Sequence, residues 1–344
     1  MAFAIATRKA KAGDKSGTVY TLEDRKRGCM AEVWPFLGFN CLKWRVKNSD
    51  GTTGDVLYTA PDWEANPVPT RSGHPILFPF PNRFRGGQFA FAGKTYQLPL
   101  NESSGKHAIH GFTPRNAWTV VSALADDDQA SIIGRFQLSE NLPEAAAHWP
   151  GDPTITLTYT LTADALRVDA EIENPTAVPL PCGLGYHPYF CIPTAPGANA
   201  DEMTLVTPAS TLWKADDGIP TGERVPVPDE LDFRQKRSIG GLVLDRLFGD
   251  LGLDDAEAGD LTRVARLGHT TARGELTVSV SPSFRELLLF TPPHRKAVAI
   301  EPYTCASDAA NLQAAGHDSG WAVLPPEAKW STTVEYRWTE NPED

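Results

Sequence analysis

The sequence predicts an all-β protein, a large antiparallel sandwich or barrel with only a few short helices. Two observations carry this prediction. The chain of 344 residues contains 28 glycines and 29 prolines, which interrupt it too often for long helices. Apolar residues alternate with polar ones over many short segments, which is the period of a strand with one buried face. Many short strands joined by turns are typical of sandwiches and barrels.

Two hairpins are the clearest elements. The first covers QFAFAGKTYQL (88–98) and turns at Ala92-Gly93-Lys94. The second, ITLTYTLTADALRVDAEIEN (155–174), turns around Ala163-Asp164. Apolar residues occupy alternate positions on both sides of that turn, which predicts an antiparallel pair with one buried face. These residues are Ile155, Leu157, Tyr159, Leu161, Leu166, Val168, Ala170 and Ile172.

Further strands are predicted toward the C-terminal end, and helices are few. The strand candidates are Leu276–Val280, Glu286–Phe290, Ala297–Ile300 and Thr333–Trp338. Short helical segments are expected at Glu144–His148 and near Asp308–Leu312. The acidic stretch LFGDLGLDDAEAGD (247–260) is predicted to be an exposed loop. No repeat or linker divides the chain, so we expect one β domain over residues 1–344.

The charge of the chain limits its partners. The formal net charge is −11 at pH 7, whereas binding to nucleic acid or an anionic membrane needs a basic surface. No apolar run is long enough to span a membrane, and the short apolar patch at the N-terminus lacks the form of a signal peptide. We therefore expect a cytoplasmic monomer or homodimer that binds a small neutral molecule, although a local basic pocket stays compatible with this charge.

The cysteines indicate neither a disulfide framework nor a metal site. Their number is odd, and no CxxC or similar ligand spacing occurs among them. They are Cys29, Cys41, Cys182, Cys191 and Cys305. We expect no metal and no cofactor, in a reducing compartment.

Two stretches in the first half of the chain contain candidate ligand-binding residues. In HPILFPFPNRFRGG, Asn82 and Arg83 follow an apolar run and can donate several hydrogen bonds into a cleft; the alternative is a turn with a solvated arginine. In HAIHGFTPRNAW, His107 and His110 are three residues apart, but Gly111 breaks the helix that a metal pair would need. Ligand binding and burial as a core histidine remain the alternatives for His110.

Two stretches in the second half contain candidate proton-transfer groups. His187 lies in GLGYHPYF, and histidine is the side chain best suited to exchange a proton near neutral pH, although a histidine among aromatics is often structural. In AVAIEPYTCASDAANL, Glu301 ends an apolar strand before Pro302, where strand pairing is expected to stop. A carboxylate at such a place is costly unless it is paired or used. Asp308 competes with it, but its position before two alanines suggests a helix cap.

Together these motifs resemble the aldose 1-epimerase (galactose mutarotase-like) family over most of the chain. That family has, in order, Asn-Arg, His-Gly, His-x-Tyr-Phe, Leu-Asp-x-x-Phe and Glu-Pro-x-Thr. Each fragment alone is common, but five in this order are fairly specific. They correspond here to Asn82-Arg83, His110-Gly111, His187-Pro188-Tyr189-Phe190, Leu244-Asp245-Arg246-Leu247-Phe248 and Glu301-Pro302-Tyr303-Thr304.

The resemblance implies a fold and a role for each residue. The fold is a β-sandwich of the large supersandwich kind, with a sugar cleft on one concave sheet. Glu301 matches the general base that takes the proton from the anomeric hydroxyl, and His187 matches the acid that protonates the ring oxygen. Asn82, Arg83 and His110 match groups around the anomeric carbon and ring. Asp245 matches a residue that holds sugar hydroxyls.

The chemistry of mutarotation suits these residue types independently. One proton leaves the C1 hydroxyl and one reaches the ring oxygen, the ring opens to the aldehyde, C1–C2 rotates, and the ring closes on the other face. An acid and a base suffice for this isomerase reaction, with no cofactor. Glutamate, with a reference pKa of about 4.3, and histidine, at about 6.5, can serve as carboxylate and imidazolium together.

Departures from the family pattern leave the substrate open. His110-Gly111 is followed by Phe112 where galactose-type members usually have a second glycine, and Tyr186 and Pro188 flank His187 in place of the usual Asn and Thr. His-Gly-Phe also resembles the hexose-6-phosphate epimerases of the same superfamily. Arginines close in sequence to the candidate residues could bind a phosphate or sulfonate if two of them converge, and otherwise they are solvated surface charges. They are Arg71, Arg85 and Arg115.

The leading hypothesis is therefore a cofactor-independent aldose 1-epimerase for a hexose, with a hexose-6-phosphate 1-epimerase as its alternative. A non-catalytic carbohydrate-binding protein would need the hydroxyl-binding groups but not the pair of Glu301 and His187. A glycoside hydrolase or lyase would need two carboxylates, which Asp245 and Glu301 could supply, but the histidines would then lack a role.

Overall fold

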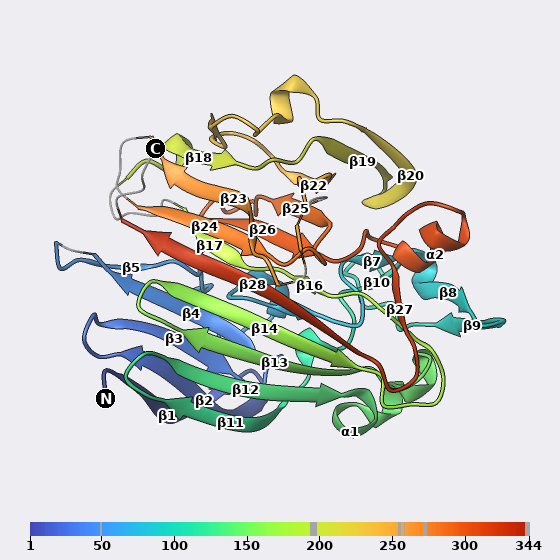
Figure 1. Ribbon diagram of the computed structural model, residues 1–344, viewed down its shortest axis with the longest axis horizontal. Coiled ribbons are helices and arrows are strands. Elements are labelled where there is room, and N and C mark those ends of the chain that lie inside the picture. The colour runs from blue at the N-terminus through green and yellow to red at the C-terminus, as the bar shows by residue number, and fades with distance from the viewer. Residues whose placement is uncertain (49, 193–197, 254–255, 258, 271–273, 341–344) are drawn as a thin grey trace.

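The fold is built from antiparallel sheets of nine, eight and five strands, joined by two-stranded ribbons (Figure 1). The structure is a computed structural model that describes residues 1–48, 50–192, 198–253, 256–257, 259–270 and 274–340. Neighbouring strands in these sheets pair in antiparallel register, so the prediction of a large antiparallel β-sandwich is confirmed.

The nine-stranded sheet contains the predicted hairpin of residues 155–174. In the described chain its strand order is β11 (Thr119–Ala125), β12 (Ala130–Gln137), β13 (Thr154–Leu161), β14 (Ala165–Glu173), β28 (Lys329–Thr339), β24 (Glu275–Val280), β23 (Thr262–His269), β18 (Met203–Val206) and β21 (Arg237–Ser238). Leu161 pairs with Leu166 across the turn. The alternating apolar residues of β13 and β14 are buried, as predicted.

The eight-stranded sheet brings together segments that lie far apart in the sequence. Its order is β20 (Ile219–Pro226), β19 (Thr211–Asp216), β22 (Asp245–Gly249), β25 (Glu286–Phe290), β26 (Ala297–Tyr303), β16 (Gly185–Tyr186) and β6 (Ile76–Leu77), and β17 (Tyr189–Cys191) also pairs with β26. Residues 77, 185 and 303 thus become neighbours. This juxtaposition assembles the site described below.

The remaining strands form the five-stranded sheet and the ribbons. The sheet comprises β1 (Phe3–Ala12), β2 (Lys15–Asp24), β3 (Cys29–Trp34), β4 (Asn40–Lys47) and β5 (Thr53–Asp55); the ribbons are β7 (Arg83–Phe84) with β10 (Ala108–Ile109), β8 (Gln88–Phe91) with β9 (Lys94–Gln97), and β15 (Leu180–Cys182) with β27 (Ala322–Leu324). Ala92 and Gly93 form the predicted turn between β8 and β9, both with positive φ.

Helical segments are short, as expected. The α-helices of the described chain are α1 (Leu138–Asn141) and α2 (Ala309–Ala314), and 3-10 segments cover Pro69–Arg71, Arg85–Gly87, Thr113–Arg115, Pro143–His148, Ala200–Glu202 and Asp229–Leu231. The helix expected at 144–148 is therefore a 3-10 segment. No helix within the described residues is long and apolar enough to cross a membrane.

The core lies between the nine-stranded sheet and the other two. Tyr159 of β13 packs against Phe39, with ring centroids 5.6 Å apart, beside the five-stranded sheet. Tyr336 of β28 packs against Phe190 of β17, at 5.5 Å, on the side of the eight-stranded sheet. All four side chains are buried. The eight-stranded sheet therefore covers the core with one face, and its other face is available for a site.

Two details of the sequence prediction were wrong. The predicted exposed loop 247–260 is wrong at its start, because residues 247–249 belong to β22 and Leu247, Phe248 and Leu251 are buried. Long-range pairing with β25 overrides the acidic composition there. The described residues 250–253, 256–257 and 259–260 contain no strand and are mostly exposed, as predicted, and residues 254–255 and 258 lie outside the described residues. Pairing also does not stop at Pro302, because β26 continues to Tyr303 and pairs there with Glu286. A proline removes one donor, and the residues on both sides of it keep the strand in place.

Candidate functional site

A cavity of about 420 Å³ opens on the outer face of the eight-stranded sheet. The motif residues singled out in the sequence all line it, although more than 200 residues separate the first from the last. They are Asn82, Arg83, His110, His187, Asp245 and Glu301. Clefts that combine apolar walls with a few convergent polar groups are the usual form of ligand sites.

Glu301 lies at the floor of this cavity. Its strand β26 pairs with β25, and Glu301 is opposite Leu288, so the two side chains share the outer face of the sheet. The carboxylate is fully buried, and its Oε2 accepts a 2.5 Å hydrogen bond from the hydroxyl of Tyr303. Burial raises the pKa of Glu301 well above its ordinary value, while the Tyr303 hydrogen bond opposes this shift.

His187 lies between β16 and β17, beside Glu301. Its backbone N–H donates to the carbonyl of Pro75 at 3.0 Å, and its ring stacks on Tyr189 with centroids 4.6 Å apart. The hydroxyl of Tyr189 lies 3.2 Å from Nε2 of His187 and donates to the carbonyl of Thr70. Burial lowers the pKa of His187 to about 3.

Glu301 and His187 are in contact but are not fully satisfied. Nε2 of His187 is 3.3 Å from Oε1 of Glu301. The angles of this contact are not those of a hydrogen bond, since Oε1 has no hydrogen-bond partner within the protein, and neither has Nδ1 of His187. A buried polar atom without a partner costs about 1–3 kcal/mol, so these atoms favour a polar ligand.

The opposite pKa shifts of the two groups have one cause. Burial disfavours charge, so it favours the protonated carboxyl and the neutral imidazole. A protonated Glu301 beside a neutral His187 has the same number of protons as a Glu301 carboxylate beside a His187 imidazolium. The two forms differ only in which side chain carries the proton. The pair therefore keeps one proton in both forms, and its net charge is zero in both.

His110 faces His187 from a strained loop. Both His110 and Asn82 have a positive φ, of 66° and 53°, and the N–H of His110 donates to the carbonyl of Asn82 at 2.8 Å. The ring of His110 meets that of His187 edge to face at 5.6 Å, and its Nδ1 is buried without a partner. Burial lowers the pKa of His110, and the neighbouring His187 and Arg83 add to the effect.

The loop needs glycine immediately after His110. Gly111 also has a positive φ, of 67°, and a Cβ on it would lie 2.2 Å from the carbonyl oxygen of Phe78. Only glycine tolerates both conditions. The His-Gly motif thus places an imidazole at the cavity by means of a close backbone contact.

Arg83 is fixed by two neighbours on the cavity wall. Its Nε donates to Glu102 at 2.5 Å and its Nη1 to the side-chain oxygen of Asn82 at 3.1 Å. The arginine and Glu102 side chains are 21% and 13% exposed, so the pair is largely shielded from water. The charge of Arg83 is therefore balanced, and its remaining N–H groups can donate to a neutral ligand.

Asp245 differs from the other carboxylates of the cavity. It begins β22, it is exposed, and its carboxylate has no hydrogen-bond or ion-pair partner among the described residues, although its backbone carbonyl accepts from Arg246. A free carboxylate at the edge of a cavity is an acceptor for two or more ligand hydroxyls.

The three arginines flagged in the sequence do not converge. Arg115 lines the cavity and is exposed, without a side-chain partner among the described residues. Arg71 instead pairs with Asp62 at 3.0 Å. Arg85 lines a separate cavity together with Asp308. Asp308 does occupy the N-cap position of α2, as expected, although its side chain accepts from the N–H of Arg85 and the side-chain amide of Asn311 rather than from the backbone of the helix.

Sequence reasoning gave no role to several residues of the cavity. Glu102 carries no local signal, because it lies in a polar loop and meets Arg83 only in the folded chain. Tyr189 and Tyr303 lie inside the quoted motifs, and a tyrosine two residues from an acid or base is on the same face of an extended strand. That spacing was the available signal.

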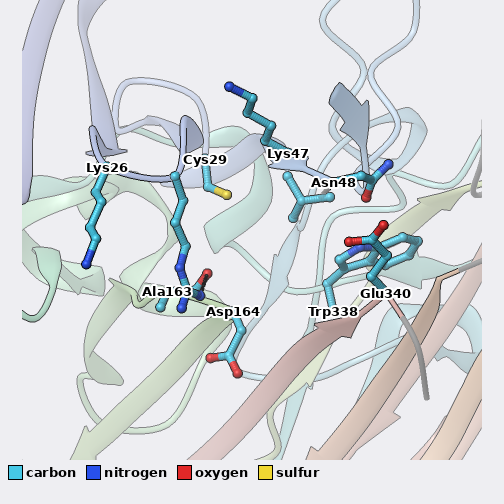
Figure 2. A pocket seen from close by; sticks show the side chains of 10 residues that line it. Lys26, Cys29, Lys47, Asn48, Ala163, Asp164, Trp338 and Glu340 are labelled. Atoms are coloured by element: carbon cyan, nitrogen blue, oxygen red, sulfur yellow. Dashed lines mark hydrogen bonds between the residues drawn. The ribbon is translucent and has the colours of Figure 1, made fainter. Parts of the chain in front are cut away.

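A larger cavity lies elsewhere and contains none of the predicted residues. It measures about 480 Å³, and Lys26, Cys29, Asp164 and Trp338 are among the side chains that surround it (Figure 2). The thiol of Cys29 has a raised pKa because of burial. Volume alone therefore does not identify the site. Unpartnered polar atoms alone do not identify it either, because Oδ1 of Asn48 and Nε1 of Trp338 in this larger cavity also lack a partner. The buried carboxyl and imidazole of Glu301 and His187, in contact with each other, distinguish the smaller cavity.

The sequence of this chain matches those of known proteins over most of its length. The family model described as aldose 1-epimerase matches residues 18–337. The chain is 30% identical over 278 residues to the maltose epimerase of Levilactobacillus brevis, covering 75% of this chain and 76% of the relative. It is 27% identical over 204 residues to human galactose mutarotase, covering 58% and 56%.

Solved structures show the same fold. A galactose mutarotase-like protein from Clostridium acetobutylicum superimposes with a TM-score of 0.83 at 23% identity, over 98% of this chain and 99% of that one. The galactose 1-epimerase of Lactobacillus acidophilus gives 0.76 at 19% identity, over 99% and 100%. At these identities the likeness shows the fold alone, whereas the family match extends across the sequence. The chain belongs to the aldose 1-epimerase family.

Proposed function

We propose that this protein is an aldose 1-epimerase in which Glu301 is the base and His187 the acid. The contact of 3.3 Å between these two side chains, in a cavity where both retain unpartnered polar atoms, carries the proposal. Membership of the aldose 1-epimerase family supports it. The same pair argues against a non-catalytic sugar-binding protein, which has no need of a proton-transfer pair.

The reaction begins from the charged form of the pair. The carboxylate of Glu301 takes the proton from the C1 hydroxyl, the bond between C1 and the ring oxygen breaks as the C1 carbonyl forms, and the imidazolium of His187 protonates that oxygen. C1–C2 then rotates, and the reverse transfers close the ring on the other face. A positioned acid or base contributes about 10²–10⁴-fold each.

Burial favours the open-chain stage of this reaction. Ring opening leaves Glu301 protonated and His187 neutral, which is the form that both pKa shifts favour. Hydroxyls of a bound sugar can supply the hydrogen bonds that the carboxylate needs for the charged form, with Tyr303 and Arg83 assisting. The free energies of the ring-closed stage, with both groups charged, and of the open-chain stage, with both groups neutral, are thereby brought closer. Repeated opening and closing of the ring requires such a balance.

The other residues of the cavity bind the sugar. Arg83, held against Glu102 and Asn82, presents further N–H donors. His110 is kept neutral by burial, so its unpartnered Nδ1 can accept or donate a single hydrogen bond according to tautomer. Asp245 accepts from hydroxyls on the far side of the cavity.

A neutral hexose fits this cavity better than a phosphorylated one. Of the arginines that line it, Arg83 is balanced by Glu102, and Arg115 is left as one exposed cation. The exposed carboxylate of Asp245 adds negative charge in the same space. The related proteins named as galactose mutarotase and maltose epimerase also indicate uncharged reducing sugars. A hexose 6-phosphate, held by Arg115, is the second candidate.

The test is the change in optical rotation of freshly dissolved α-D-glucose and α-D-galactose. We expect the wild type to accelerate it and Glu301→Gln to remove roughly 10²–10⁴-fold of the rate. Glu32→Gln is the matched control, since Glu32 is also buried, at 5% exposed, and is held by Trp34 and Arg8 outside the cavity. The same assay with glucose 6-phosphate compares the two substrate classes. No acceleration of any aldose by the wild type would refute the proposal.

A further inference from the structure

A second cavity, of about 370 Å³, adjoins the first on the same face of the sheet. The two cavities share three lining residues, Asn82, Asp245 and Leu288. They are therefore two compartments of one cleft that runs across the strands. The first compartment contains the acid and base, and the second has no role in the reaction proposed above.

The strand register shows how the two compartments are aligned. Glu301 is opposite Leu288, and Leu288 is opposite Leu247. On the next strand Leu212 is opposite Phe248, which places Trp213 beside Leu247. These side chains form one row on one face, and three strand spacings cover about 14 Å. That length is sufficient to accommodate two linked pyranose rings.

Trp213, at the end of this row, is fixed by polar neighbours. Nε1 of Trp213 donates to Oε2 of Glu286 at 2.8 Å, and Arg224 donates to the other oxygen of Glu286 at 2.9 Å. The guanidinium of Arg224 also lies 4.3 Å from the centre of the Trp213 ring. Glu286 is fully buried. This network holds Trp213 in one orientation and gives the second compartment a fixed apolar wall.

The hairpin that forms the rim is tied to the first compartment. Asp217, in the turn between β19 and β20, pairs with Lys106 at 2.9 Å. A Cβ on the adjacent Gly218 would lie 3.0 Å from the guanidinium of Arg83. At the same rim Lys214 pairs with Glu223 at 2.7 Å. These charges are balanced within the protein. Arg246 and Asp245, which also line the compartment, are one exposed cation and one exposed carboxylate, so the lining as a whole suits an uncharged ligand group.

We propose that the second compartment binds the non-reducing sugar residue of a reducing disaccharide whose reducing unit occupies the first. This proposal rests on the proposed epimerase function, because it takes the anomeric centre to lie at Glu301 and His187. The apolar row of Leu288, Leu247 and Trp213 faces the second ring. Asp245, at the boundary, accepts hydroxyls from both units.

The test compares anomeric exchange of glucose with that of maltose, cellobiose and lactose, measured by NMR. Ala215 is exposed at the rim, so Ala215→Trp fills the second compartment without disturbing the core. We expect this variant to lower kcat/KM for the preferred disaccharide at least tenfold more than for glucose. Thr221→Trp, also exposed on the same hairpin but outside this compartment, is the matched control and leaves that ratio unchanged. Equal effects of Ala215→Trp on glucose and on every disaccharide would overturn the proposal.

A binding measurement separates this proposal from the epimerase function. With Glu301→Gln, saturation-transfer NMR detects which sugar protons contact the protein. We expect transfer to both rings of the preferred disaccharide, and selective loss from the non-reducing ring in Glu301→Gln/Ala215→Trp. Transfer confined to the reducing ring overturns the second subsite even if epimerase activity is present. Absence of anomeric exchange with transfer to both rings would instead refute the epimerase function alone.

Discussion

Two buried histidines of this protein have almost the same pKa and very different surroundings. Burial lowers the pKa of both His74 and His187 to about 3. In the core, the two ring nitrogens of His74 lie 2.9 and 2.8 Å from the hydroxyls of Tyr159 and Tyr336. In the cavity, His187 has an unpartnered Nδ1 and touches Glu301 without a directed hydrogen bond.

The difference teaches which observation distinguishes a site from a structural network. Burial and a shifted pKa are common to both histidines and decide nothing. What separates them is whether their hydrogen-bonding atoms have partners. Both ring nitrogens of His74 have a hydroxyl partner, whereas Nδ1 of His187 and Oε1 of Glu301 have none and border a cavity. The two buried glutamates differ in the same way. Trp213 and Arg224 donate to the two carboxylate oxygens of Glu286, whereas Oε1 of Glu301 has no hydrogen-bond partner.

The largest expected effect is on the rate, at His187. His187→Asn removes the acid but keeps a polar side chain of smaller size in the cavity wall. We expect kcat for anomeric exchange to fall by roughly 10²–10⁴-fold, while the free energy of unfolding changes little. Polarimetry and urea denaturation measure the two quantities on the same preparation. A loss of rate that merely follows a loss of folded protein would contradict the assignment.

The opposite result is expected at His74. His74→Phe leaves the hydroxyl of Tyr336 without its imidazole partner, whereas that of Tyr159 keeps the backbone carbonyl of residue 74. An unsatisfied buried group costs about 1–3 kcal/mol. Stability measured by urea denaturation therefore falls, and kcat of the folded fraction stays within a few-fold of wild type. Adding Tyr336→Phe to this variant removes one stranded hydroxyl and recovers part of the stability. No recovery would mean that His74 is not the hydrogen-bond partner of Tyr336.

A smaller effect is expected in the pH dependence of stability at Glu286. Burial raises its pKa from 4.5 to about 7, despite Arg224. The folded state therefore holds a proton that the unfolded state has lost, so stability is highest below pH 4.5 and falls as pH rises to about 7. Glu286→Gln removes this contribution, at most about 1.4 kcal/mol per pH unit. Parallel stability profiles of variant and wild type over this range would contradict it.

The smallest effect is expected at Arg115. Its side chain is exposed and has no partner among the described residues. With a neutral hexose, Arg115→Leu lowers kcat/KM by a few-fold at most. A selective collapse of activity toward glucose 6-phosphate, measured beside glucose, would favour the phosphorylated substrate instead.

Much of the fold was predictable because its signal is local. The alternation in 154–161 and 165–173 follows from burial of one face, and it appears in the sequence without any knowledge of the partner sheet. The start of the stretch 247–260 was mispredicted for the converse reason. Its first residues are held by pairing with β25, about 40 residues later in the chain, and composition contains no trace of that contact.

The motif residues that line the cavity were named from the sequence, but their geometry was not predictable. Ordered motifs named Glu301 and His187, yet nothing local says that β16 lies beside β26. The support for these residues was missed as well. Glu102 meets Arg83, and Trp213 meets Glu286, through contacts that exist only once distant loops and strands are assembled. The second compartment had no signal in the sequence at all.

The most direct test of the central claim is a double-mutant cycle on the acid and base. Rates of anomeric exchange are measured for wild type, Glu301→Gln, His187→Asn and the double variant with one aldose. Because both groups act in one proton transfer, we expect each single variant to lose most of the catalysis and the double variant to be no slower than the slower single one. Losses that multiply in the double variant, or a single variant that retains the wild-type rate, would contradict the account.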